Sequence, residues 1–166
     1  MTICVVALGK IGLPLAVQFA SKGHRVIGAD VDQRVVDLVN AGTEPFPGEF
    51  ELDVKLQQTV DDGLLTATTD TAAAVSESDA VVIVVPLFVD AEGIPDWGWM
   101  DAATKAIAAG LKPGTLVSYE TTLPVGTTRD RWLPMLEEGS GLKAGEDFSL
   151  AFSPERVLTG RVFADL

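Results

Sequence analysis

A glycine turn near the start of the chain is the first candidate for chemistry. The stretch VVALGKIGLPLA (5–16) runs from an apolar segment through Gly9 and Gly12 into a helix-like segment. Glycines at such a turn let a pyrophosphate approach the backbone and let the helix pack closely, while free N–H groups at the helix start bind phosphate. The spacing predicts a dinucleotide site, although Ala7 stands where the first glycine of the usual pattern would be. We expect Ala7 to make this turn with a negative φ.

Asp30 is the second candidate, because it ends the apolar segment RVIGAD (25–30). An acidic residue there can accept hydrogen bonds from the adenosine ribose hydroxyls, and its charge would repel a 2′-phosphate, which favours NAD over NADP. Asp32 is expected to start the next helix, and Arg34 could pack against adenine or lie on a solvated helix face. The alternative is an ordinary α/β turn whose glycines serve packing and whose acid caps a helix.

Three polar loops each follow a predicted strand: VVPLFVDAEGIPD (84–96), YETTLPVGTT (119–128) and FSPERVLTGRV (152–162). Ligands bind outside the carboxyl ends of the strands in open parallel sheets, so these loops are expected at the edge that carries Gly9 and Asp30. The alternative for each is an ordinary connection with a helix cap, such as Thr127.

The order of the elements that must position these residues predicts an α/β fold. Strands are expected over 2–8, 25–30, 64–70, 79–86, 114–120 and 148–155, with helices over 12–22, 32–42, 71–78, 99–110 and 127–138 and weak helical character over 52–62. The continuous apolar runs 2–8 and 79–85 indicate strands buried on both faces of a parallel sheet. We therefore predict one Rossmann-like, doubly wound domain over 1–166, with a mainly parallel sheet and helices on both faces.

Composition excludes several classes of partner. The net charge of −12, from 12 basic and 24 acidic residues, argues against nucleic acid or an anionic membrane, since both require clustered Lys and Arg. The apolar run AVVIVVPLFV (80–89) is too short to span a bilayer. A single cysteine and the lack of a signal-peptide pattern fit a cytoplasmic protein, and without a His/Cys cluster we predict no metal.

Other reactive or aromatic side chains are expected to serve packing. Cys4 lies in the apolar run 2–8, away from the ligand edge, where a thiol has little reason to ionise. Trp97, Trp99 and Met100 are expected to pack a helix or form an interface in preference to a ligand platform.

Four segments resemble the UDP-glucose/GDP-mannose dehydrogenase family, whose members are nucleotide-sugar 6-dehydrogenases: GKIGLPLA, GADVD, ETTLPVGTT and SPERVLTGRV. The resemblance runs over the whole chain, and SPERVLTG is most similar to the branch acting on UDP-N-acetylmannosamine or UDP-N-acetylglucosamine. It implies oxidation of the sugar C6 alcohol to a carboxylate with two NAD. The cysteine that forms a thiohemiacetal and then a thioester, and a lysine, would lie in a helical linker and C-terminal domain absent here. The chain is thus expected to be the inactive front part of a longer homodimeric enzyme.

The resemblance also implies roles for single residues. Thr122 would lie beside the nicotinamide and help to position water, and Glu155 would act as base or water-orienting group in thioester hydrolysis. Leu87 stands where a threonine hydroxyl usually contacts NAD, and Thr159 replaces a second glutamate, which argues against the UDP-glucose branch. The expected cofactor-binding residues are Gly9, Lys10, Ile11, Gly12, Asp30, Val31, Arg34, Val85, Pro86, Leu87, Thr121, Thr122 and Glu155.

Two other functions are alternatives. A β-hydroxyacid-type NAD-dependent dehydrogenase would use a lysine from a following helical domain, and a non-catalytic module would bind NAD only as a sensor.

Overall fold

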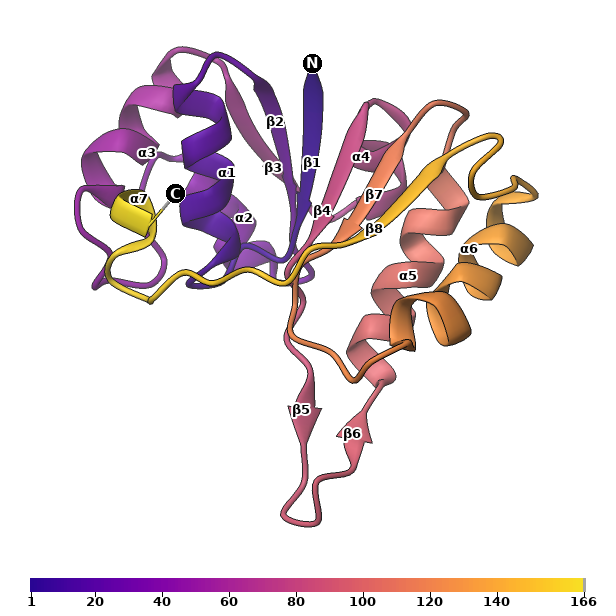
Figure 1. Cartoon of the computed structure of the whole chain (residues 1–166). Coiled ribbons are helices and arrows are strands. Elements are labelled where there is room, and N and C mark those ends of the chain that lie inside the picture. Colours follow the sequence, from indigo (N-terminus) through magenta and orange to yellow (C-terminus); the bar gives the residue numbers. More distant parts are fainter. Residues whose placement is uncertain (166) are drawn as a thin grey trace.

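A parallel six-stranded sheet forms the centre of the computed structural model, which describes residues 1–165 (Figure 1). Its strand order is β3-β2-β1-β4-β7-β8, and every neighbouring pair is parallel. The strands are β1 (Thr2–Val6), β2 (Arg25–Ala29), β3 (Leu65–Thr68), β4 (Ala80–Ile83), β7 (Leu116–Tyr119) and β8 (Ser149–Phe152). Because all six run in the same direction, their carboxyl ends meet at one edge of the sheet.

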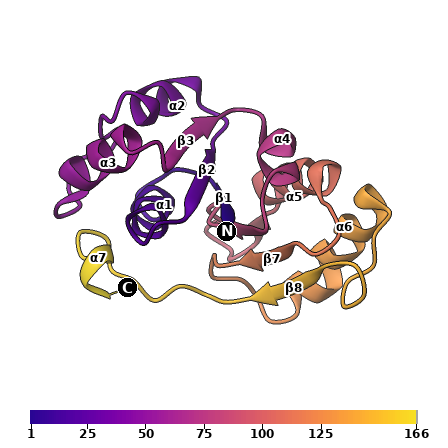
Figure 2. The same cartoon turned by 90° about the horizontal axis from the view of Figure 1, so that it is seen from above.

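Helices bury both faces of the sheet (Figure 2). Successive side chains of β1 alternate between two apolar clusters: Cys4 and Val6 join one, and Ile3 and Val5 join the other. The first cluster contains residues of α4, α5, η1 and α6, and the second contains residues of α1, α2 and α3. The helices are α1 (Gly12–Ser21), α2 (Gln33–Asn40), α3 (Leu52–Asp61), α4 (Thr71–Ser76), α5 (Gly98–Gly110), the π-helix η1 (Thr128–Trp132), α6 (Leu133–Ser140) and α7 (Val162–Asp165).

The predicted doubly wound fold is confirmed, with four local differences. The strands are shorter than expected, so that β1 ends at Val6 and β8 at Phe152. The predicted helix 127–138 divides into η1 and α6, and Pro134 lies at the start of α6, where its missing N–H is tolerated. The short helix α7 was not predicted. The hairpin of β5 (Phe88–Val89) and β6 (Pro95–Asp96) was also missed, and it projects away from the sheet (Figure 1).

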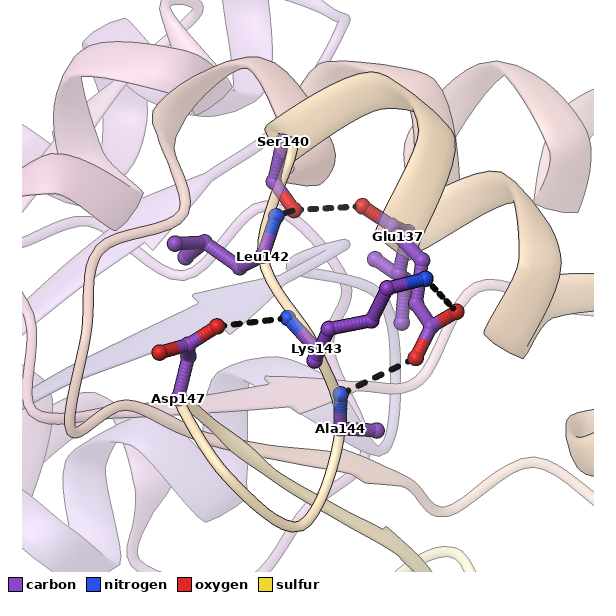
Figure 3. Close-up of polar contacts among 7 residues, drawn as sticks. Glu137, Ser140, Leu142, Lys143, Ala144 and Asp147 are labelled. Carbon is purple, nitrogen blue, oxygen red and sulfur yellow. Dashed lines mark hydrogen bonds and ion pairs between the residues drawn. The ribbon is translucent and has the colours of Figure 1, made fainter.

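Side-chain contacts add to the backbone hydrogen bonds that hold the turn after α6 (Figure 3). Gly141 ends the helix with a φ of 73°, a left-handed conformation that glycine adopts without strain. Glu137 then accepts hydrogen bonds from Lys143 Nζ at 3.0 Å and from the Ala144 N–H at 3.1 Å, while Asp147 accepts one from the Lys143 N–H at 2.8 Å. These bonds set where the chain enters β8.

The end of the described chain crosses from β8 back to the α1 and α3 side of the sheet (Figure 2). Glu49 fixes it there, because its carboxylate accepts hydrogen bonds from the Gly160 N–H at 2.6 Å and the Val162 N–H at 2.7 Å. Val162 is fully buried beneath this contact. We call the Glu49 contact with residues 160 and 162 the Glu49 clasp.

Candidate functional site

The carboxyl edge of the sheet gathers the segments from which function was predicted. The glycine turn follows β1, Asp30 follows β2, Val85 and Pro86 follow β4, and residues 121–128 follow β7. Glu155 lies beyond β8, and its N–H donates to the Glu120 carbonyl at 3.0 Å.

Ala7 adopts a φ of 76°, so the prediction of a negative φ at this residue was wrong. The turn has to bring the chain from β1 directly into α1, and a left-handed residue makes that reversal. Gly12 shows how tight it is: a Cβ on Gly12 would lie 1.9 Å from the Ala7 carbonyl oxygen. A Cβ on Gly9, in contrast, would meet nothing within 4 Å, which leaves open space in front of this residue. The missing first glycine thus strains the backbone without closing the site.

Replacing Ala7 with glycine should therefore stabilise the chain. Relief of the left-handed strain gains about 1–2 kcal/mol, and the greater freedom of glycine in the unfolded chain offsets about 0.4–1 kcal/mol of it. We expect a net gain of about 0.5–1 kcal/mol in the free energy of urea unfolding. Ala41→Gly is the matched control, because Ala41 has a φ of −85° and should gain nothing. If Ala7→Gly were no more stable than the original chain, this result would contradict left-handed strain at Ala7.

The start of α1 offers unpaired donors beside Gly9. Within the described residues, no N–H of 9–12 donates a hydrogen bond, and no side chain caps the helix. Helix N-termini carry a partial positive charge and bind phosphate through such N–H groups. Lys10 is exposed on the same turn. The turn therefore fits the pyrophosphate of a dinucleotide, and it does so without a third glycine.

Asp30 is held in place by two backbone bonds. Its carboxylate oxygens accept from the Leu8 N–H at 2.7 Å and the Asp32 N–H at 2.9 Å, so the side chain ties the end of β2 to the glycine turn. Each oxygen keeps a lone pair for a ligand hydroxyl. Asp32 caps α2 through the Arg34 N–H at 2.9 Å, which confirms the predicted helix start. Arg34 itself is exposed on that helix.

A cleft of about 380 Å³ opens between the ends of β1, β2 and β4 and helix α5. It brings together five of the predicted cofactor-binding residues, namely Gly9, Asp30, Val31, Val85 and Pro86. Its other lining residues are Val6, Ala7, Ala29, Thr71, Trp99, Ala102, Ala103 and Ala106. Asp30 is the one ionisable side chain among them, so the cleft is an apolar slot with a single carboxylate.

The remaining predicted residues lie outside this cleft. Gly9 and Lys10 also line a smaller cavity of about 150 Å³, whose opposite wall includes Glu49 and Thr159. Ile11 and Gly12 lie in the glycine turn at the start of α1. Leu87 packs against the apolar cluster that contains residues of α4, α5, η1 and α6.

Sequence reasoning missed the wall that α5 contributes. Trp99, Ala102, Ala103 and Ala106 are spaced i, i+3, i+4 and i+7, which places them on one helix face. The sequence did carry a signal for this wall. Three alanines lie on one face of a helix that begins near the ligand edge of the sheet, and small side chains leave room for a ligand.

The loop after β7 is fixed at both ends. Thr121 Oγ1 donates to the Val85 carbonyl at 2.7 Å, which joins this loop to the cleft edge, whereas Thr122 is exposed. At the far end, Asp101 on α5 accepts from Trp132 Nε1 at 3.0 Å and forms an ion pair with Arg131. The hydrogen bond from Arg131 holds the pKa of the Asp101 carboxyl below its usual range.

Glu155 has a carboxylate neighbour that the sequence did not indicate. Burial raises the pKa of the Glu120 carboxyl, a hydrogen bond from Ser118 at 3.1 Å opposes the rise, and the charge of Glu155 adds to it. Glu155 is half-buried and accepts from the Val157 N–H at 2.9 Å. Two carboxyl groups therefore lie near each other beyond β7 and β8.

Cys4 is fully buried in β1, as predicted, and burial raises the pKa of its thiol to about 12. The thiol is thus protonated at neutral pH and is not a nucleophile in this fold. Among residues 1–165, no three His, Cys, Asp or Glu side chains are grouped to hold a metal ion. No helix in the same range is both long and apolar enough to cross a membrane.

A protein-family model and curated proteins similar in sequence agree on one family. Residues 1–166 match the model of the UDP-glucose/GDP-mannose dehydrogenase family, NAD binding domain. UDP-N-acetyl-D-mannosamine dehydrogenase of Campylobacter jejuni is 42% identical over 173 residues, covering 99% of this chain and 41% of that protein.

Two solved structures are similar over nearly the whole chain. A ternary complex of GDP-mannose dehydrogenase from Pseudomonas aeruginosa has a TM-score of 0.94 at 32% identity, covering 99% of this chain and 38% of that one. The UDP-D-ManNAc dehydrogenase from Pyrococcus horikoshii has a TM-score of 0.92 at 35% identity, again covering 99% and 38%. The chain thus spans about two fifths of the length of these relatives.

Proposed function

Because this chain belongs to the UDP-glucose/GDP-mannose dehydrogenase family and corresponds to its NAD binding domain, we propose that it carries NAD for a nucleotide-sugar 6-dehydrogenase. The proposed substrate class is UDP-N-acetylaminosugars, since the C. jejuni relative is named a UDP-N-acetyl-D-mannosamine dehydrogenase. The family match over the whole chain favours this function over a β-hydroxyacid dehydrogenase or a non-catalytic sensor.

The cleft between the glycine turn, Asp30 and α5 is the observation that carries the proposal. In it, the free N–H groups at the start of α1 bind the pyrophosphate, and the Asp30 carboxylate accepts from the ribose hydroxyls. Val31 and Pro86 line the adenosine end. NAD, when bound, supplies a hydride acceptor for the sugar C6. An apolar slot with one carboxylate fits a nucleoside, whose base is flat and whose ribose carries a diol.

The other predicted roles belong to Thr122, which follows β7, and Glu155, which follows β8. Thr122 is exposed on the loop that Thr121 fixes to Val85, and we propose that it positions water near the nicotinamide. Glu155 is proposed as the base for hydrolysis of the thioester, with Glu120 as its neighbour. The cysteine and lysine of the reaction are expected from the part of the relatives that this chain does not span. The cytoplasmic location, expected from the single cysteine and the lack of a signal-peptide pattern, stays a prediction, as does the homodimer that the family resemblance implies.

Two assays test this function. Calorimetry of the 166-residue chain should show NAD binding with a dissociation constant of about 0.1–1 mM, because a cleft open on one side gives modest affinity. The complete gene product should form two NADH per molecule of UDP-N-acetylmannosamine, followed by absorbance. One NADH per molecule would indicate a simple alcohol dehydrogenase, and no NAD binding by the chain would contradict the proposal outright.

A further inference from the structure

Trp99 differs from the other two tryptophans of the chain. Trp132 is fully buried, and Trp97 is half-buried with its ring centroid 5.9 Å from that of Trp132. Trp99 is 60% exposed, although burial of a ring of this size would stabilise the fold. The expectation of helix packing is therefore confirmed for Trp97 and Met100, which pack against the apolar core. Trp99 does not pack into that core.

The exposed indole lies on the wall of the cleft. Trp99 is in the first turn of α5, and the three alanines that follow it on the same helix face also line the cleft. The wall opposite is formed by Asp30 and Val31 at the end of β2. The alanines leave a space in a cleft that is lined both by the flat indole and by the one carboxylate, Asp30.

Phe88 fixes the plane of this indole. The two ring centroids are 5.1 Å apart and the planes are nearly perpendicular at 88°, an edge-to-face contact favoured between aromatic rings. Phe88 belongs to β5 of the projecting hairpin (Figure 1), and its ring contact joins the hairpin to Trp99 in the first turn of α5. A ring that is held in orientation but left exposed toward a cleft is preorganised for a flat ligand group.

We infer that Trp99 is a cofactor-contacting residue that forms the aromatic wall for the adenine end of the dinucleotide. The inference rests on the proposed function, and it assigns Trp99 and its Phe88 support to the same side of the cofactor as Asp30. Aromatic contact with a base typically contributes enough affinity for a change of tenfold or more on removal.

Tryptophan fluorescence tests this directly, with calorimetry of the same samples. NAD and AMP should quench the emission of the chain with the same midpoint as the calorimetric titration, and nicotinamide mononucleotide should not. Trp99→Phe should abolish the quenching but keep NAD affinity within about threefold, because an aromatic face remains. Trp99→Ala should weaken NAD binding about tenfold. Trp97→Phe is the matched control and should keep both the quenching and the affinity.

The possible failures are distinguishable. Wild-type affinity and quenching in Trp99→Ala would overturn the inference and leave the proposed function intact, whereas no NAD binding by any variant would overturn both. Phe88, Val89 and Ile94 are also exposed on the hairpin, so sedimentation of each variant is included. A change of oligomeric state in Trp99→Ala, with unchanged NAD affinity, would mean that this surface docks protein, and it would overturn the inference.

Discussion

Replacing Asp30 with alanine should weaken NAD binding by about 10- to 150-fold, which corresponds to the 1.5–3 kcal/mol typical of a hydrogen bond to a charged group. The carboxylate that would face the ribose also holds the Leu8 and Asp32 N–H groups, so alanine removes both the ligand contact and its support. Calorimetric titration with NAD and NADP measures the change. NADP affinity should fall less than NAD affinity, because the charge that repels a 2′-phosphate is removed.

Two further variants separate these effects. Asp30→Asn keeps one oxygen for a backbone N–H but loses the charge, so it should retain the fold and still narrow the preference for NAD over NADP. Asp79→Ala is the matched control, since Asp79 also accepts a backbone bond, from the Thr2 N–H at 2.8 Å, but at the opposite end of β1. Asp79→Ala should bind NAD normally. Unchanged affinity of Asp30→Ala for both cofactors would remove Asp30 from the site.

Gly12→Ala should destabilise the fold by about 3 kcal/mol, the upper end of the usual cost of overpacking. Its methyl group would lie 1.9 Å from the Ala7 carbonyl oxygen and 2.7 Å from Val84 Cγ2, and a backbone oxygen cannot rotate away. Since a domain of this size has a stability of about 5–15 kcal/mol, the variant should unfold at much lower urea concentration. Urea unfolding followed by circular dichroism measures this change.

Gly9→Ala is the informative companion to that variant. A Cβ on Gly9 meets no protein atom within 4 Å, so the fold should keep its stability within about 0.5 kcal/mol. Its methyl group would instead enter the space that a pyrophosphate needs, and NAD affinity should fall. Normal NAD binding by Gly9→Ala would place the phosphates elsewhere, and equal stability of the Gly12 and Gly9 variants would refute the close approach to Ala7.

The sheet could be predicted from the sequence because its central strands are buried on both faces. In β1 and β4 nearly every residue is apolar, and this continuity distinguishes a central parallel strand from a half-exposed one. The glycine turn and Asp30 were predictable for a related reason, since their spacing reflects a backbone geometry that few residues satisfy.

What the sequence did not reveal depends on contacts between distant segments. The φ of Ala7 is set by the closeness of α1 to β1, and alanine carries no local signal for a left-handed turn. The hairpin has only two residues in each strand, too few for an alternating pattern. Glu120 is paired with Glu155 only because β7 and β8 are neighbours, and this neighbourhood is a property of topology.

The Glu49 clasp limits when its own segment can be secured in folding. It joins Glu49 to a residue 113 positions further along, so it can close only after residue 162 has been synthesised. Closing a loop of this length costs conformational entropy in the unfolded chain, and the paired sheet lowers that cost by holding the two segments near each other. The segment that passes beside the smaller cavity depends on the two Glu49 bonds, so their loss would release it locally. An opening of this kind would remove Thr159 from the wall of the smaller cavity while the six strands remain paired.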